Sequence, residues 1–310
     1  MNCLRQRLLR CLLLCAGLSG LLSQVALAGA VLDATPRVAI VSAFAPELGL
    51  LMGKLEQVKQ HKVNGVTFST GVLQGKPVVL FVSGVSMVNA AMNTQLVLDR
   101  FTVTHLVFSG IAGGVNPALN IGDVVVPQRW GQYLEVLMAR EPSAGRYAPP
   151  VWMDDVKLPN FGMMHPRPQR VRSGARAEEE QKFWFDVDPL MLAVARSIQA
   201  TPLADCDAAN KCLQTKPKLV IGGTGVSGQA FVDNAAFREY TFKTFDANVL
   251  DMESAATALV AYSNGVPFIA FRSLSDLAGG GGGENEVATF MKIAADNAAK
   301  VLLAFLAAWK

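Results

Sequence analysis

The stretch FIAFRSLSDLAGGGGGENE, residues 268–286, contains the clearest indication of the fold class. An apolar run of strand length carries Arg272, Ser275 and Asp276 at its end, and five consecutive glycines follow at once. A run that is apolar on both faces is typical of a strand inside a sheet that helices cover on both sides. The stretch therefore predicts an α/β fold, and it raises the question of what a carboxylate does at the end of a buried strand.

Apolar runs of the same kind recur along the chain, with helical stretches between them. We expect strands at 37–43, 77–83, 104–110, 121–127, 218–223 and 266–271, and helices at 87–100, 253–263 and 287–309. These elements predict a single domain with a central mixed β-sheet flanked by helices, which is a three-layer sandwich.

The first 28 residues have the layout of a secretory signal peptide. They carry three arginines, Arg5, Arg7 and Arg10, near the start, continue with a mostly apolar stretch at 12–22 and end in Ala26-Leu27-Ala28, a small-x-small exit. The apolar stretch is shorter than the roughly 20 residues that a spanning helix needs. A lipoprotein signal at Cys15 is the alternative, although the small residue expected just before such a cysteine is absent. We therefore expect a protein exported to the periplasm or secreted, with residues 29–310 as its domain and no stable membrane span.

The charge balance gives no indication of nucleic-acid binding. The chain has 28 Lys and Arg against 25 Asp and Glu, and loss of the three arginines of the signal leaves 25 of each. Three of the five cysteines also lie in the signal, which leaves Cys206 and Cys212. In an oxidising compartment we expect a local disulfide between them rather than free thiols. Two cysteines without a nearby histidine make a poor metal site, so we expect no metal.

The middle of the chain, at about 128–215, differs in composition from the rest. It is rich in Pro, Arg and Gly and indicates a long surface excursion rather than core. Loops of this length are uncommon unless they have a function or an attachment.

Two glycine-rich stretches follow predicted strands. Gly223-x-Gly225-x-x-Gly228 imitates a dinucleotide fingerprint, but it stands late in the chain and no small-residue helix start follows. We interpret these glycines as places where backbone approaches another strand or a ligand. In FSGIAGG, residues 108–114, the glycines allow backbone N–H groups to turn toward the end of the strand, where ligands dock in open α/β sheets, although a simple tight turn also needs glycine.

Three acids stand at or just past the carboxyl ends of apolar strands. Each has an ordinary structural interpretation, because Glu47 and Glu253 fit the first turn of a helix and Asp276 fits a helix cap. Together, at the same edge of one predicted sheet, they indicate a site.

Five stretches in this order resemble the nucleoside phosphorylase superfamily. They are VSAFAPELGLL, FSGIAGGVNPALNIGDVVVP, GGTGVSGQAF, VLDMESAATA and FRSLSD, and the likeness covers residues 37–128 and 217–308. Within the superfamily the chain is most similar to the methylthioadenosine/S-adenosylhomocysteine nucleosidases. The middle segment, with FWFDVDP at 183–189, resembles exported members and plant bark storage proteins.

The resemblance implies a role for each acid. Glu47 matches the glutamate that activates the attacking water, and Glu253 matches the one that holds the ribose hydroxyls, with Met252 packing against the sugar. Asp276 matches the aspartate that protonates the purine at N7. The chemistry needs such a set, because the sugar becomes oxocarbenium-like and the purine leaves badly unless an acid protonates it while a base prepares water. Burial at the end of an apolar strand favours a protonated Asp276, and the glycine run is then a mobile lid or, alternatively, an inert linker.

The resemblance also implies the rest of the substrate site. Phe231 matches the residue that stacks on the base, Val232 the one whose backbone binds the base edge, and Arg272 the arginine near the water and ribose. The remaining expected substrate contacts are Phe44, Val85, Ile111, Ala112, Gly113 and Ser275. No cofactor is implied, and a homodimer is the family expectation.

Three departures from the family pattern leave alternatives open. AFAPELG replaces the Gly-Asp-Pro-x-Arg phosphate loop of the phosphorylases, which favours hydrolysis. Ile111 stands where nucleosidases have Ser or Thr, and Gln229 replaces an acid before the stacking Phe. We expect a hydrolase of a purine, most simply adenine, nucleoside; a nucleoside-binding or storage-like protein and a phosphorylase are the alternatives. The exact nucleoside and any preference for a 5′-thio group stay open.

Overall fold

A twelve-stranded mixed sheet forms the centre of the computed structural model, which describes residues 30–153, 155–207 and 210–310. The predicted signal peptide lies outside the described residues. The sheet runs β14-β7-β16-β17-β5-β1-β4-β3-β2, with β18 beside β5 and with β6 and β15 beyond it. Its strands are β1 (Asp33–Ser42), β2 (Glu56–Val63), β3 (Val66–Leu73), β4 (Lys76–Val82), β5 (Phe101–Gly114), β6 (Val124–Val126), β7 (Arg129–Gln132), β14 (Trp184–Asp186), β15 (Leu219–Ile221), β16 (Thr224–Ser227), β17 (Ala247–Asp251) and β18 (Phe268–Asp276).

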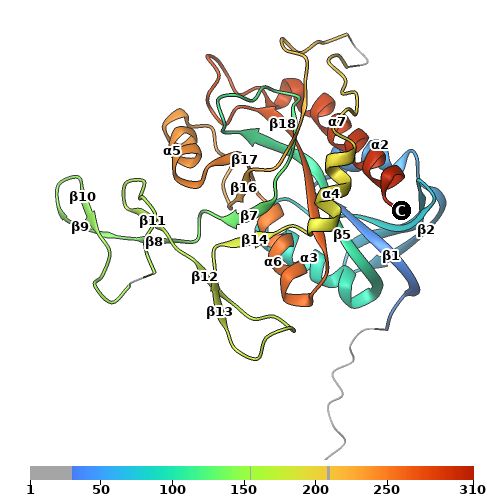
Figure 1. The fold of residues 1–310 in the computed structure, drawn as a ribbon, viewed down its shortest axis with the longest axis horizontal. Helices are drawn as coiled ribbons and strands as arrows, with labels where there is room; N and C mark the ends of the chain where they lie inside the picture. The colour runs from blue at the N-terminus through green and yellow to red at the C-terminus, as the bar shows by residue number, and fades with distance from the viewer. Residues whose placement is uncertain (1–29, 154, 208–209) are drawn as a thin grey trace, which may run out of the picture.

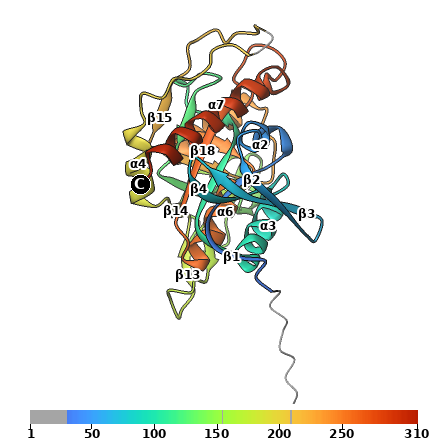
Figure 2. The same cartoon turned by 90° about the vertical axis from the view of Figure 1, so that its right-hand side faces the viewer.

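Helices cover both faces of the sheet (Figure 2). In the described residues they are α2 (Ala45–Met52), α3 (Met87–Arg100), α4 (Pro189–Ser197), α5 (Ala235–Phe245), α6 (Ser254–Asn264) and α7 (Val287–Ala308). The pair α2 and α7 packs on one face, and the pair α3 and α6 packs on the other. The face of α6 is rich in buried alanines, which let its backbone approach the sheet closely. The predicted α/β sandwich is confirmed.

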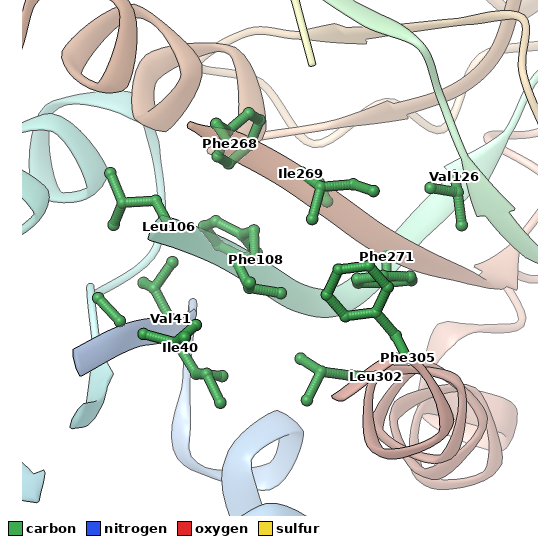
Figure 3. Packing of buried hydrophobic residues seen from close by; sticks show 14 of the residues in the cluster. Ile40, Val41, Leu106, Phe108, Val126, Phe268, Ile269, Phe271, Leu302 and Phe305 are labelled. Atoms are coloured by element: carbon green, nitrogen blue, oxygen red, sulfur yellow. The ribbon is translucent and has the colours of Figure 1, made fainter. Parts of the chain in front are cut away.

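The core lies where β5 pairs in parallel with β1 on one side and with β18 on the other. All nine residues of β18 are buried, as the apolar run at 268–276 predicted. Side chains of β18 meet those of α7, with the rings of Phe271 and Phe305 centred 5.1 Å apart (Figure 3). Each such fully buried side chain stabilises the fold by roughly 1.5–3 kcal/mol, so the three parallel strands form a rigid support for whatever stands at their carboxyl ends.

The six predicted strands and three predicted helices are present, but the chain also forms elements that the apolar pattern did not indicate. The β2–β3 hairpin is one of them, since most of β2 is exposed and polar. Its turn is Asn64-Gly65, with positive φ at both residues, which is the usual sequence of a two-residue hairpin turn.

The prediction that 128–215 is surface rather than core is wrong for residues 129–132, at its start, and for residues 184–197. Strands β7 and β14 pair with each other inside the central sheet, and Trp130 and Phe185 are fully buried. The reason is that these short strands bury large aromatic rings, a signal that the surrounding Pro and Arg residues mask. The middle of the segment projects from the body as three small two-stranded sheets (Figure 1). They pair β8 (Val136–Met138) with β11 (Met164–Pro166), β9 (Arg140–Ser143) with β10 (Arg146–Ala148), and β12 (Gln169–Val171) with β13 (Glu180–Lys182).

Two further expectations, the disulfide and the role of the glycines, have a structural outcome. The disulfide between Cys206 and Cys212 is present. The glycines of the dinucleotide-like motif allow close strand approach, because a Cβ at Gly225 would lie 2.6 Å from the Trp130 ring. Across the three described ranges, we find no helix long and apolar enough to cross a membrane and no cluster of His, Cys, Asp or Glu suited to a metal ion.

Candidate active site

A cavity of about 210 Å³ opens at the carboxyl ends of the central strands. Twelve of the thirteen expected site residues line it, namely Phe44, Glu47, Val85, Ile111, Ala112, Gly113, Phe231, Val232, Met252, Glu253, Ser275 and Asp276. The thirteenth, Arg272, is fully buried beside the acids. Segments far apart in the sequence therefore meet at one place, because each follows a strand of the same sheet.

Glu47 lies in the first turn of α2 and is almost completely buried. Its Oε2 accepts a hydrogen bond from the N–H of Ala43 at 2.6 Å, and its Oε1 accepts one from the N–H of Ile111 at 2.7 Å. Burial raises the pKa of Glu47 from its ordinary 4.5 to about 7, helped by the charge of Glu253 and opposed by Arg272. A carboxyl with a pKa near neutrality that main-chain donors hold in place is suited to general-base chemistry.

Close approach at Gly110 explains how Glu47 fits against β5. A Cβ at this position would lie 2.4 Å from Oε1 of Glu47 and 2.6 Å from an Arg272 nitrogen. Glycine is therefore required at 110 for the packing of the acid and the arginine. Gly113 lines the cavity itself, which agrees with the interpretation of FSGIAGG as a ligand-facing strand end.

Asp276 is the last residue of β18, lines the same cavity and is also buried. Its Oδ1 accepts from the N–H of Ala278, and its Oδ2 accepts from the hydroxyl of Ser275, both at 2.8 Å. Burial raises the pKa of Asp276, while these two bonds and the Asn285 side chain oppose the shift. The direction favours an acid that keeps its proton in the folded protein.

Glu253 and Arg272 form a buried ion pair in the site. Glu253 accepts from the N–H of Ser86 at 2.8 Å and pairs with Nη2 of Arg272 at 3.2 Å. Burial raises the pKa of Glu253, although Arg272 opposes the shift. The Arg272 guanidinium also stacks over the Phe108 ring at 3.9 Å, so it is held by an aromatic face as well as by charge.

Asp251 is a buried acid of the site that the sequence reasoning missed. Its Oδ2 lies 2.8 Å from Nε of Arg272, and its Oδ1 accepts from the N–H groups of Glu253 and Ser254 at the start of α6. Asp251 immediately precedes the recognised Met252-Glu253 pair, and its position at the end of an apolar strand was the available signal. Arg272 is therefore the one cation that contacts Glu47, Asp251 and Glu253 among the described residues.

The remaining wall of the cavity is apolar. Phe231 is 58% exposed at its mouth, beside the buried Val232. The other lining residues that sequence reasoning missed are Ala43, Ala230, Leu250, Val287 and Met291. Val287 and Met291 come from the first turns of α7, which no strand-end argument could locate.

Comparison with known proteins agrees with this geometry. The family model for the phosphorylase superfamily matches residues 37–307. The 5′-methylthioadenosine/S-adenosylhomocysteine nucleosidase of Bacillus cereus (strain G9842) is 29% identical over 248 residues, which cover 78% of this chain and 87% of that protein. The corresponding protein of Bacillus thuringiensis (strain Al Hakam) matches to the same extent.

Solved structures share the fold. The 5′-methylthioadenosine/S-adenosylhomocysteine nucleosidase of Colwellia psychrerythraea 34H, in complex with adenine, superposes with a TM-score of 0.65 at 25% identity and covers 88% of this chain and 95% of its own. The futalosine hydrolase of Helicobacter pylori strain 26695 superposes with a TM-score of 0.63 at 20% identity, over 87% and 97% of the two chains, which shows likeness of fold alone. With its strand ends, its cavity and a family match over most of its length, this chain belongs to the phosphorylase superfamily.

Proposed function

We propose that the protein is a nucleosidase that hydrolyses the N-ribosidic bond of a purine nucleoside, with adenine as the base. The observation that carries the proposal is the pair of buried carboxyls, Glu47 and Asp276, which line one cavity with raised pKa values. Hydrolysis of this bond needs a base for the water and an acid for the leaving purine, and two such carboxyls supply both.

In this proposal Asp276 donates its proton to N7 of the purine as the bond to the sugar breaks. The hydroxyl of Ser275 and the N–H of Ala278 fix the carboxyl group, so one orientation of the proton is favoured. Phe231 stacks on the base, and the backbone of Val232 binds the base edge. Adenine fits the proposal because the relatives are named for adenine nucleosides and one solved relative holds adenine.

Glu47 takes a proton from the water that attacks the anomeric carbon. Both of its oxygens are anchored by main-chain N–H groups, so the remaining lone pairs are available to a water in the cavity. Glu253 binds the ribose hydroxyls, and Met252 packs against the sugar. Arg272 compensates the charge of Glu253 and lies 3.8 Å from Oε1 of Glu47.

The charges favour water over phosphate as the nucleophile. None of the described residues that line the cavity is Lys or Arg, and the buried Arg272 is already paired with three carboxylates. A phosphate dianion beside Glu47 and Glu253 would meet repulsion without a free cation to offset it. A phosphorylase is therefore the weaker interpretation.

The test is base release from adenosine, methylthioadenosine and inosine, each with and without inorganic phosphate. We expect free adenine and free sugar without phosphate. Release that requires phosphate would support a phosphorylase, and tight binding without release would support a nucleoside-binding protein. Comparison of adenosine with methylthioadenosine reports whether a 5′-thio group is preferred.

We further propose that the protein is an exported homodimer. The disulfide between Cys206 and Cys212 supports an oxidising compartment. Exposed apolar side chains on α3 and β8, Val88 and Met92 at 65% and 58% exposed and Met138 at 55%, support burial of this surface by a second copy. Sedimentation equilibrium of the purified chain tests the dimer, and periplasmic fractionation tests the export.

A further inference from the structure

Asp251 ends β17 and uses its two carboxylate oxygens for different partners. Its Oδ1 serves the start of α6, where it accepts from the N–H groups of Glu253 and Ser254, both at 3.2 Å, and it also accepts from the hydroxyl of Ser227. Its Oδ2 has no hydrogen-bond partner among the described residues and lies 2.8 Å from Nε of Arg272. One oxygen therefore caps a helix, and the other is left for the arginine.

Arg272 is shared among three carboxylates, and Asp251 is the nearest of them. Nη2 of the arginine lies 3.2 Å from Oε2 of Glu253, and Nη1 lies 3.8 Å from Oε1 of Glu47. The second of these distances is too long for a hydrogen bond. All four side chains are at most 5% exposed, so water screens their charges little and the attraction falls with distance. Among the carboxylates, Asp251 therefore contributes most to where the guanidinium lies.

The remaining hydrogen bonds of Arg272 are to neutral groups. Its Nε donates to the hydroxyl of Ser254 and its Nη1 to the carbonyl of Ile111, both at 2.9 Å. Glu47 and Arg272 also pack against the same point of β5, since a Cβ at Gly110 would meet both of them. The guanidinium therefore lies beside Glu47, and a short shift would bring the two within hydrogen-bond distance.

We infer that Asp251 is a positioning residue that holds Arg272 away from Glu47, so that lone pairs of Glu47 stay free for the attacking water. The inference rests on the proposed function, in which Glu47 is the base. Main-chain N–H groups already take one lone pair on each oxygen of Glu47, and a guanidinium at hydrogen-bond distance would take another. It would also stabilise the charged carboxylate, and a carboxylate stabilised in this way is a weaker base.

The charged and titratable groups around the Asp251–Arg272 pair come from several elements. Glu47 belongs to α2, Glu253 precedes α6, and Tyr133 lies in the turn after β7. Burial raises the pKa of Glu253, Arg272 opposes the shift and Asp251 adds to it. Burial and the charge of Asp251 raise the pKa of Tyr133 above its ordinary 10, so this group stays neutral below pH 8. Removal of the Asp251 charge therefore lowers the pKa of Glu253 directly and that of Glu47 through Arg272.

Asp251→Asn separates the helix cap from the ion pair. Its carbonyl still accepts from the start of α6, because Asn caps helices as well as Asp does, and its uncharged NH₂ group then faces Arg272. We expect the plateau of kcat/KM for the best purine nucleoside to fall about ten- to hundredfold. We also expect the acidic limb of the pH profile to move down by about one pH unit. Asp251→Glu keeps the carboxylate on a longer side chain, so its acidic limb should stay at the wild-type pH.

The matched control is Asp188→Asn, which removes the same charge from another helix cap. Asp188 accepts from the N–H of Met191 at 2.8 Å at the start of α4. Its own N–H donates to the carbonyl of Phe268, the first residue of β18, whereas the cavity lies at the other end of that strand. We therefore expect this variant to keep the wild-type rate and pH profile.

Urea unfolding of all four proteins from pH 5 to pH 8 gives a readout that needs no turnover, and it also checks that each variant is folded. Burial raises the pKa of Glu47, so the wild type loses stability as the pH rises from 4.5 to about 7. A guanidinium closer to Glu47 reduces that shift. We therefore expect the stability of Asp251→Asn to fall less with rising pH than that of wild type.

If Asp251→Asn is folded and keeps both the kinetic profile and the pH-dependent stability of wild type, Asp251 is a helix cap only and the inference is wrong. If Asp251→Asn does not fold, Asp251→Glu decides. An acidic limb at lower pH in that variant, which still has the carboxylate, overturns the inference, and a limb at the wild-type pH supports it. If the wild type releases no base, the proposed function fails, while the unfolding measurement still reports whether Asp251 keeps Arg272 from Glu47.

Discussion

Replacement of Glu47 by Gln should make the protein more stable at alkaline pH relative to wild type while removing its activity. A carboxyl that burial keeps partly protonated must ionise in the folded state to act as a base, and that ionisation destabilises the fold. The sign of this pH dependence follows from the direction of the pKa shift of Glu47. The pKa of Glu47 is raised, so its favourable contribution is complete below the unfolded value of 4.5 and is lost as the pH rises to about 7.

The magnitude follows from the two pKa values. Each unit of difference corresponds to about 1.4 kcal/mol, so a carboxyl that titrates at 4.5 when unfolded and at about 7 when folded lowers the free energy of unfolding by about 3 kcal/mol at pH 8. At pH 5 the same two pKa values lower the free energy of unfolding by about 1 kcal/mol. The advantage of Glu47→Gln over wild type should therefore increase by about 2.5 kcal/mol between pH 5 and pH 8.

The assay is urea unfolding of both proteins at pH 5, 6, 7 and 8 with the disulfide intact. Glutamine places an NH₂ group opposite the N–H of Ala43 or of Ile111, so the variant loses one hydrogen bond at every pH. That loss lowers the free energy of unfolding of the variant by about 1 kcal/mol at every pH. It therefore does not affect the change in stability difference between pH 5 and pH 8. Glu56→Gln, at an exposed position of β2, controls for the removal of one negative charge.

A difference between wild type and Glu47→Gln that stays constant from pH 5 to pH 8 would refute the reasoning. It would mean that the carboxyl ionises in the folded protein as readily as in the unfolded chain. Loss of base release in the variant, about 10²- to 10⁴-fold for removal of a general base, is the matching kinetic result.

Three further substitutions probe the rest of the site. Asp276→Asn keeps the shape but carries no transferable proton, so we expect base release to fall about 10²- to 10⁴-fold with nucleoside binding retained, measured by calorimetry. Phe231→Ala should weaken substrate binding by about 1–3 kcal/mol through lost stacking, seen as a higher KM at little change in unfolding temperature because Phe231 is half exposed. Arg272→Met should destabilise the protein by about 3–5 kcal/mol, measured by urea unfolding, since Asp251 and Glu253 would stay buried without their cation.

The sequence predicted the elements that are apolar on both faces and missed those that are not. Strands such as β18 bury every residue, so a continuous apolar run identifies them. Strand β2 exposes most of its residues and is defined by pairing with β3, which composition does not reveal. The Asn64-Gly65 turn was the local signal for this hairpin. Strand β7 is short, and it joins the sheet because Gly225 of β16 makes room for the Trp130 ring, a fit that exists only in three dimensions.

The candidate site was predictable to the extent that strand ends define it. Glu47, Glu253 and Asp276 each follow a strand, and the sheet brings them to one edge. Asp251 was missed because its importance comes from the distance to Arg272, which depends on how β17 and β18 lie on either side of β5. Met291 reaches the cavity only because α7 begins at the end of the glycine-rich segment.

Ile111 bears most directly on whether the site can turn over substrate. The family resemblance made its lack of a hydroxyl an argument against activity, yet the contact that Ile111 makes with Glu47 uses its backbone N–H, which any residue other than proline supplies. Its carbonyl likewise accepts from Nη1 of Arg272 at 2.9 Å. The main chain at 111 thus holds both Glu47 and Arg272, while the side chain only adds apolar surface to the cavity. A missing hydroxyl removes one contact to water or ribose but leaves Glu47 and Arg272, which the proposed mechanism uses, in place. Under that proposal Ile111 is better understood as a determinant of what the cavity admits than as a sign of lost chemistry.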